Sequence, residues 1–270
     1  QSLYERPPQP PFCLNWGHHS TRGIKACWPL GNPCLDGYNV ANPNIYRMTN
    51  NNAPGISVGD GAGYSHVFNG SNQDEEIAAT AVLTTFPMTL EAWINPTNAT
   101  AQQAILVLSD GDTGAAYFVL EAAGHIAGDP IRGQKQASGQ SPEVFAASTI
   151  GYGLSYWQHA CMTCTSATLV AAYCRGGGYG ESTTNSTPAS IARTMIAAFR
   201  VTTSYFSPYT GRIADAIIRN VVLSPTEVME RSDPGKRYAI YHPLGRTTYG
   251  FVVAAPPGGN RRRRVLMGAL

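Results

Sequence analysis

The sequence predicts an all-β protein, a sandwich of two antiparallel sheets with extended N- and C-terminal arms. Three observations support this fold class. From residue 65 onward, apolar and polar residues alternate with a period of two, as in strands with one buried face. Hydrophobic residues make up 43% of the 270 residues and charged residues only 13%, so the chain can form a sizeable core. A convincing start signal for a helix occurs only once, near residue 224.

The first part of the chain predicts an arm, one strand and a long irregular region. Residues 1–21 begin with several prolines, which favour an extended, polyproline-like arm. Residues 23–30 (GIKACWPL) predict the first strand. Residues 31–63 are dense in Asn, Gly and Pro, so we expect turns and irregular loops there rather than a periodic element.

Two hairpins are predicted in the middle of the chain. Residues 104–108 are apolar at every position, which predicts a central strand buried on both faces. The turn at 109–114 (SDGDTG) leads back into residues 115–121, so these two strands form the first hairpin. Residues 157–165 and 168–174 predict the second.

The end of the chain predicts one short helix and an arm. Ser224, Pro225 and Glu227 form a capping box with proline at the first helical position, and the helix must end before Pro234. Beyond it, an apolar run precedes four consecutive arginines, Arg261, Arg262, Arg263 and Arg264. We therefore divide the chain into an N-terminal arm (1–22), a β-sandwich (23–230) and a C-terminal arm (231–270).

Bulk composition excludes several classes of protein. The net charge of +2 gives no general attraction to nucleic acid, and no run of about 18 apolar residues could span a membrane. The six cysteines show no disulfide framework, so we expect free thiols in a reducing compartment.

Several short motifs follow one another in a characteristic order. They are Trp28-Pro29-Leu30, Phe68-Asn69-Gly70 followed by Asp74, Thr89–Pro96, Trp157-Gln158-His159, and Gly211 through Glu227. The ordered set resembles the concanavalin A-like lectin/glucanase superfamily, in its laminin-G-like or pentraxin-like branch. The resemblance covers roughly residues 23–230 and implies a jelly-roll sandwich that binds or assembles. The two arms are also similar to those of laminin-G-like proteins encoded by tailed bacteriophages, which implies a place on a virion.

Catalysis is not expected. A retaining glycosidase needs two carboxylates about 5–5.5 Å apart. In the glucanase relatives that the resemblance implies, they come from a Glu-x-Asp-x-x-Glu strand, which this sequence lacks. The glutamates are either adjacent, as in Glu75-Glu76, or isolated, as are Glu91, Glu121 and Glu143. We therefore assign no catalytic residue.

No cofactor is expected, although the resemblance implies that calcium could bind through loop carboxylates. Its ligands would come from Asp60, Asp74, Asp110 and Asp112, and calcium needs roughly six to eight oxygens at about 2.3–2.6 Å. The alternative is that Asp110-Gly111-Asp112 simply forms a hairpin turn.

Aromatic residues in predicted loops are the remaining indication of binding. They are Tyr152, Tyr156, Tyr179, Tyr205, Phe206 and Tyr209. Sugar rings stack on such faces, but tyrosine is also enriched at protein interfaces, so a glycan and a protein partner both stay open.

The sequence thus predicts a non-enzymatic protein at the surface of a phage virion, such as a capsid decoration protein. Trp16 and the four arginines would anchor the arms to capsid or other virion proteins. We expect a homo-oligomer, and neither a membrane nor nucleic acid as a partner. The alternative function is a lectin-like module that recognises host or environmental glycans.

Overall fold

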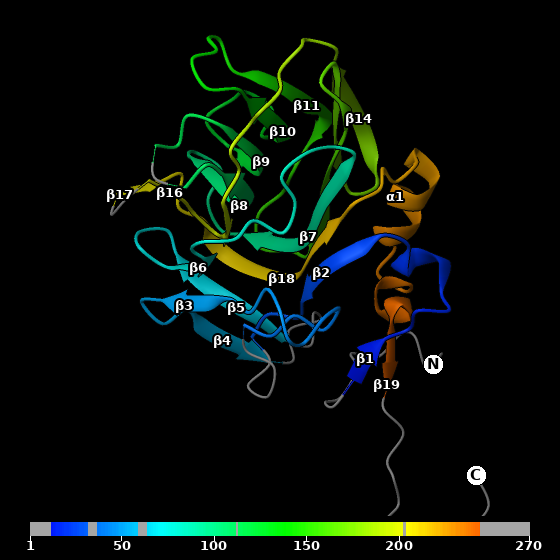
Figure 1. Cartoon of the computed structure of the whole chain (residues 1–270). Helices are drawn as coiled ribbons and strands as arrows, with labels where there is room; N and C mark the ends of the chain where they lie inside the picture. The colour runs from blue at the N-terminus through cyan, green and yellow to red at the C-terminus, as the bar shows by residue number, and fades with distance from the viewer. Residues whose placement is uncertain (1–11, 32–36, 59–63, 112, 202–203, 244–270) are drawn as a thin grey trace, which may run out of the picture.

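Two large antiparallel sheets pack face to face (Figure 1). This computed structural model describes residues 12–31, 37–58, 64–111, 113–201 and 204–243. One sheet has seven strands in the order β11-β10-β9-β8-β15-β6-β3. The other has eight, in the order β14-β13-β12-β7-β18-β5-β4 with β2 paired to β18. The sandwich predicted from the sequence is confirmed.

The seven-stranded sheet is built around β8, the strand predicted to be central. Its bulge between Ala104 and Leu106 breaks the simple alternation. As a result, Ile105 and Leu106 both belong to the core between the sheets, whereas Ala104 and Val107 belong to a cluster on the outer face. The strands are β3 (Thr49–Asn51), β6 (Asp74–Ile77), β8 (Gln102–Ser109), β9 (Tyr117–Ala123), β10 (Pro130–Gln136), β11 (Val144–Gly151) and β15 (Arg193–Ile196).

The eight-stranded sheet has β7 and β18 at its centre. Cys161 and Cys164 are three residues apart on β12 and therefore point to opposite faces. Cys164 lies in the core between the sheets and Cys161 on the outer face. The strands are β2 (Ile24–Trp28), β4 (Gly55–Val58), β5 (Tyr64–Asn69), β7 (Met88–Pro96), β12 (Gln158–Ser166), β13 (Leu169–Cys174), β14 (Gly177–Ser182) and β18 (Thr210–Arg219).

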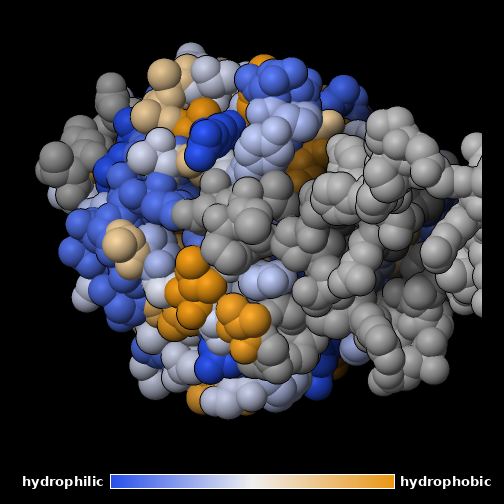
Figure 2. Space-filling view, turned by 90° about the horizontal axis from the view of Figure 1, so that it is seen from below, coloured by the Kyte–Doolittle hydropathy of each residue, from blue (hydrophilic) through white to orange (hydrophobic). Residues whose placement is uncertain are grey.

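The prediction of no periodic element in residues 31–63 is wrong in part. β3 and β4 form there, each at one edge of a sheet. β3 has the sequence Thr-Asn-Asn, which shows no alternation of apolar and polar residues. It is a strand because its backbone pairs with β6, and the sequence does not indicate that pairing. On β4, Ile56 and Val58 remain 49% and 64% exposed. Seen from below, the surface shows hydrophilic residues interspersed with apolar patches (Figure 2).

The terminal segments cover part of the outer face of the eight-stranded sheet. β1 (Phe12–Leu14) pairs with β19 (Tyr241–Pro243), and Leu14, Ile240 and Tyr241 pack with outward-facing side chains of β2 and β18. η2 (His19–Thr21), α1 (Pro225–Arg231) and η3 (Arg237–Ile240) complete this layer (Figure 1). Residues 12–22 and 231–243, placed in arms by the sequence, are thus packed on the sandwich. The division into arms and sandwich remains a prediction for residues 1–11 and 244–270, which lie outside the described residues.

The short helix α1 begins as predicted. Ser224 Oγ accepts a hydrogen bond from the Glu227 amide, and the Glu227 carboxylate accepts one from the Ser224 amide. Its seven residues are far fewer than a membrane span requires, and in the described part of the chain no helix is long and apolar enough to cross a bilayer.

A buried charged cluster fastens α1 and η3 to the sheet. The Glu91 carboxylate accepts hydrogen bonds from Arg219 Nη2 (2.7 Å) and from Arg231 Nε (3.5 Å), while Arg237 Nε donates to Asp215 Oδ2 (2.6 Å). Burial alone would raise the pKa of Glu91, but the two guanidinium groups outweigh it and hold the pKa well below its usual value. Glu91 is therefore ionised and ties the last helix to β7.

Candidate functional site

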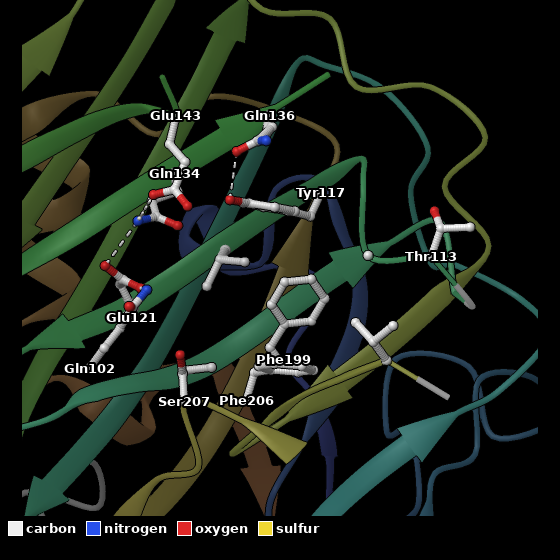
Figure 3. Close-up of a pocket in the computed structure, with 14 residues that line it drawn as sticks. Gln102, Thr113, Tyr117, Glu121, Gln134, Gln136, Glu143, Phe199, Phe206 and Ser207 are labelled. Carbon is white, nitrogen blue, oxygen red and sulfur yellow. Dashed lines mark hydrogen bonds between the residues drawn. The ribbon is translucent and has the colours of Figure 1, made fainter. Parts of the chain in front are cut away.

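A cavity of about 390 Å³ lies on the outer face of the seven-stranded sheet. Its floor comes from β8, β9 and β10, and one wall comes from the hairpin of β16 (Phe199–Val201) and β17 (Ser204–Phe206) (Figure 3). The alternation of strand residues explains the floor: Tyr117, Val119 and Glu121 share one face of β9, and their neighbours on that strand point into the core.

The polar part of the floor is centred on Gln134. Its side-chain amide donates to Glu121 Oε1 (3.2 Å) and to Glu143 Oε2 (3.4 Å). Glu121 also accepts hydrogen bonds from Gln102 Nε2 (2.6 Å) and from Arg132 Nε. These contacts follow from strand register, since Glu121 is directly opposite Arg132 on β10. The floor is thus held by a connected set of amide and carboxylate groups (Figure 3).

Burial shapes the ionisation of the floor. It raises the pKa of Glu121, against which the charge of Arg132 acts. It also raises the pKa of Tyr117, and the nearby Glu143 carboxylate acts in the same direction. The Tyr117 hydroxyl consequently stays protonated and donates to Gln136 Oε1 (2.8 Å).

The apolar wall is made by two phenylalanines. Phe199 and Phe206 are opposite each other in the β16–β17 hairpin, and the rings of Phe199 and Tyr117 are 5.1 Å apart between centroids. Phe206 remains 51% exposed. The cavity therefore presents exposed aromatic surface across from an amide-rich floor.

The other side of the hairpin is anchored to β6. Glu76 forms ion pairs with Arg193 (3.0 Å) and with Arg200 of β16. The Tyr205 hydroxyl of β17 donates to Asp74 Oδ1 (3.1 Å). Burial raises the pKa of Asp74, which Arg200 partly offsets. These contacts position the wall over the sheet.

Glu121 and Glu143, which the sequence treated as isolated, meet in this cavity on either side of Gln134. That expectation is corrected, because pairing of β9 with β10 and of β10 with β11 brings them together. Glu121 is fully buried and both its oxygens accept hydrogen bonds. A glycosidase nucleophile must instead contact its substrate. The geometry suits hydrogen bonding to a ligand better than bond cleavage.

Sequence reasoning missed most of this cavity. Gln102, Gln134 and Gln136 lie on strands, and polar residues at outward positions are typical of any solvated sheet face. The one indication was that Arg132, Gln134 and Gln136 are polar at every second position of one strand, whereas the strand before it, residues 115–121, is mostly apolar. That pattern predicts the outer face but does not show that a hairpin encloses it.

The predicted aromatic residues lie in different places. Phe206 lines the cavity, and Tyr205 lies behind it against Asp74. Tyr152 and Tyr209 are buried at 5% and 0% exposure in the core between the sheets. Tyr179 is exposed on β14, where its hydroxyl donates to Glu181. Tyr156 is also exposed, and its hydroxyl accepts a hydrogen bond from Arg175.

Of the predicted anchoring residues, Trp16 is 58% exposed and lines a second hollow with His18, His19 and Arg22. Arg261, Arg262, Arg263 and Arg264 lie outside the described residues.

The predicted calcium ligands are not brought together in the described residues. Asp110 accepts hydrogen bonds from the backbone amides of Gly114 (2.8 Å) and Ala116 (3.2 Å), so it stabilises the turn between β8 and β9. Asp74 is held by Tyr205, while Asp60 and Asp112 lie outside the described residues. Throughout the described part of the chain no three His, Cys, Asp or Glu side chains group to hold a metal. Asp74 and Asp110 thus have partners within the protein, and calcium binding by Asp74, Asp110 and Asp112 stays a prediction from the sequence.

Comparison with known families agrees with this architecture. The family model described as the concanavalin A-like lectin/glucanases superfamily matches residues 48–229. The chain belongs to this superfamily. No curated protein matches its sequence significantly. The matched range includes every strand of the two large sheets except β2, and it includes the β16–β17 hairpin.

Several solved structures are similar to this chain in fold. It is similar to domain 4 of AbnA, a GH43 extracellular arabinanase from Geobacillus stearothermophilus in complex with arabinotriose, with a TM-score of 0.62 and 16% identity over 78% of this chain and 98% of that one. It is also similar to the binding domain of Paraclostridial Mosquitocidal Protein 1, with a TM-score of 0.56 and 11% identity over 77% of this chain and 51% of that one. The TM-score with a heptameric SAP-like pentraxin from Limulus polyphemus is 0.49, with 14% identity over 62% of this chain and 80% of that one.

Proposed function

We propose that this protein is a non-catalytic carbohydrate-binding domain whose ligand occupies the cavity on the seven-stranded sheet. The observation that carries the proposal is the exposed Phe206 facing the amides of Gln134 and Gln136 across one cavity. A sugar ring has an apolar C–H face and a rim of hydroxyls, so it matches an aromatic wall and an amide floor at the same time.

The size of the cavity and the fold support this function. Small-molecule sites typically occupy about 300–1,000 Å³, and this cavity falls in that range. The structurally similar domain 4 of AbnA is in complex with arabinotriose, which makes a neutral oligosaccharide the first ligand to test. The same geometry gives no support to turnover, because Glu121 is buried beneath Gln102 and Gln134.

The test is binding of arabinotriose and of a glycan array by the wild-type protein and two variants. Phe206→Ala removes the aromatic wall and should weaken binding by about fivefold to tenfold, because a stacked aromatic is worth about 1 kcal/mol. Gln134→Ala should have an effect of at least that size. Tyr179→Ala is the matched control, since Tyr179 is exposed on the other sheet. Absence of sugar binding, or equal binding by the Phe206 variant, would overturn the proposal.

Attachment to a phage virion remains a prediction from the sequence. It depends on residues of the two arms, most of which lie outside the described residues. Carbohydrate binding and virion attachment are compatible, because a carbohydrate-binding domain can be carried on a particle surface. Co-purification of the full chain with particles, and loss of that co-purification on deletion of residues 244–270, would support virion attachment.

A further inference from the structure

The charges around the cavity are unevenly balanced. Arg132 is the cation nearest the floor, but its Nε donates to Glu121 and its guanidinium lies 4.6 Å from the centroid of the Phe145 ring. Arg132 and Glu121 are both almost fully buried. Their charges therefore offset each other beneath the floor, and Arg132 does not line the cavity.

Glu143 is in a different position. It precedes β11, is exposed at the edge of the cavity and has Gln134 as a hydrogen-bond donor (3.4 Å). Among the described residues, no Lys, Arg or His nitrogen forms an ion pair with its carboxylate within 4.0 Å. His125 interacts with it at longer range, but burial lowers the pKa of that imidazole, which keeps it uncharged at neutral pH. The charge of Glu143 therefore faces the ligand.

Apart from Glu121, whose charge Arg132 offsets, the other polar groups of the lining are uncharged. Gln102, Gln136 and Ser207 offer amide and hydroxyl groups that can donate to and accept from sugar hydroxyls. We propose that the cavity selects uncharged sugars over sugars carrying a carboxylate or sulfate, and that Glu143 is the residue that sets this selectivity. This inference rests on the proposed function, since it names the class of sugar that the same cavity takes.

The size of the effect follows from Coulomb's law. Two like charges about 4 Å apart repel by about 1 kcal/mol even in bulk water, and by more near a protein surface. A sugar acid next to Glu143 should therefore bind at least about fivefold more weakly than its neutral counterpart. Salt screens exposed charges, so the difference should shrink as ionic strength rises.

The experiment is an array that displays each oligosaccharide in neutral form and in 6-sulfated or carboxylated form. The ratio of acidic to neutral binding is measured for the wild type, Glu143→Gln and Glu181→Gln. Gln at position 143 keeps the shape of the side chain, so bulk added to the sugar affects both proteins equally. Glu181 is an exposed glutamate on the other sheet and serves as the matched control.

We expect a ratio below about one fifth for the wild type at low ionic strength, a rise of at least about threefold in Glu143→Gln, and no change in Glu181→Gln. If the wild type binds acidic and neutral forms equally, or if the ratio is the same in Glu143→Gln, the selectivity is refuted. In that case, binding of neutral glycans that is still weakened by Phe206→Ala would continue to support the proposed function. A protein that binds no glycan at all overturns both.

Discussion

Glu91 shows how a single residue can connect distant parts of the chain. Its carboxylate, on β7, is contacted by Arg219 from β18, Arg231 from α1 and His159 from β12. All four residues are at most 2% exposed. Charges without solvent must be paired with each other, so the loss of one leaves the remainder uncompensated.

We predict that Glu91→Gln lowers the free energy of unfolding by about 3–5 kcal/mol, because Arg219 and Arg231 remain buried without their counter-charge. Urea unfolding measures the change. Glu181→Gln, at an exposed position, should change it by less than about 0.5 kcal/mol. A loss below about 1 kcal/mol in Glu91→Gln would mean that the cluster relaxes into contact with water.

The low pKa of Glu91 also predicts a pH dependence. The unfolded chain has a glutamate pKa of about 4.3, above that of the folded state, so the unfolded chain binds more protons in this range. The stability from Glu91 is fully present above about pH 4.3 and is lost as the pH falls toward the folded value. Unfolding curves at a series of pH values should show a slope there that is smaller in Glu91→Gln.

For single residues, the sequence indicated the local motif of a side chain better than it indicated which distant side chains lie near it. His159, which belongs to the Trp157-Gln158-His159 motif, is buried beside Trp93 with 5.8 Å between ring centroids. The meeting of Glu121 with Glu143 could not be predicted, because it depends on the register of three strands rather than on spacing along the chain.

Among the elements, the β16–β17 hairpin has the most direct link to the proposed function. One side carries Phe199 and Phe206 into the cavity, and the other side is tied to β6 through Tyr205 and Arg200. The hairpin forms a two-stranded sheet of its own and adds no strand to either large sheet. Its position therefore depends on these polar contacts and on the packing of Phe199 against Tyr117. An element held in this way can loosen without unfolding the sandwich.

We predict that Tyr205→Phe loosens this hairpin, because the hydrogen bond to the Asp74 carboxylate is removed while the ring is kept. Amide hydrogen exchange in β16 and β17 should accelerate by about tenfold, as expected for loss of one hydrogen bond to a charged group. Sugar affinity should fall by less than in Phe206→Ala. Unchanged exchange rates would show that Glu76 and Arg200 suffice to hold the hairpin.

The sequence predicted those elements whose local signals agree with their environment. α1 was located from its capping box, and the β8–β9 and β12–β13 hairpins from turn residues. β3 and β4 were missed because short edge strands are defined by their partners. The bulge in β8 could not be predicted, because residues 104–108 are all apolar and the hydrophobic pattern is the same whichever face each side chain points to.

At the scale of the whole molecule, the folded body includes more of the chain than the sandwich alone. Residues 12–22 and 231–243 pack together and cover Ile24 and Ile217 on the outer face of the eight-stranded sheet. Arg237 also lies over the Trp93 ring, 4.9 Å from its centroid. These contacts are long-range in sequence, which is why composition alone placed both segments in arms.

We predict that a chain of residues 12–243 folds cooperatively, whereas a chain of residues 23–230 does not. The shorter chain loses Arg231, Arg237 and Tyr241, so Glu91 and Asp215 keep their charges with fewer partners. Thermal unfolding and binding of a hydrophobic dye compare the two. Equal melting temperatures would show that the sandwich needs no cover.

Pairing of Phe12 with Pro243 brings the two ends of the described body side by side, on the face turned away from the cavity. A host protein could therefore carry this domain as an insertion, entering and leaving through neighbouring strands, with no need to stretch the chain around the sandwich. A larger body that holds the domain by these ends would lie on the side of the sandwich away from the proposed sugar cavity.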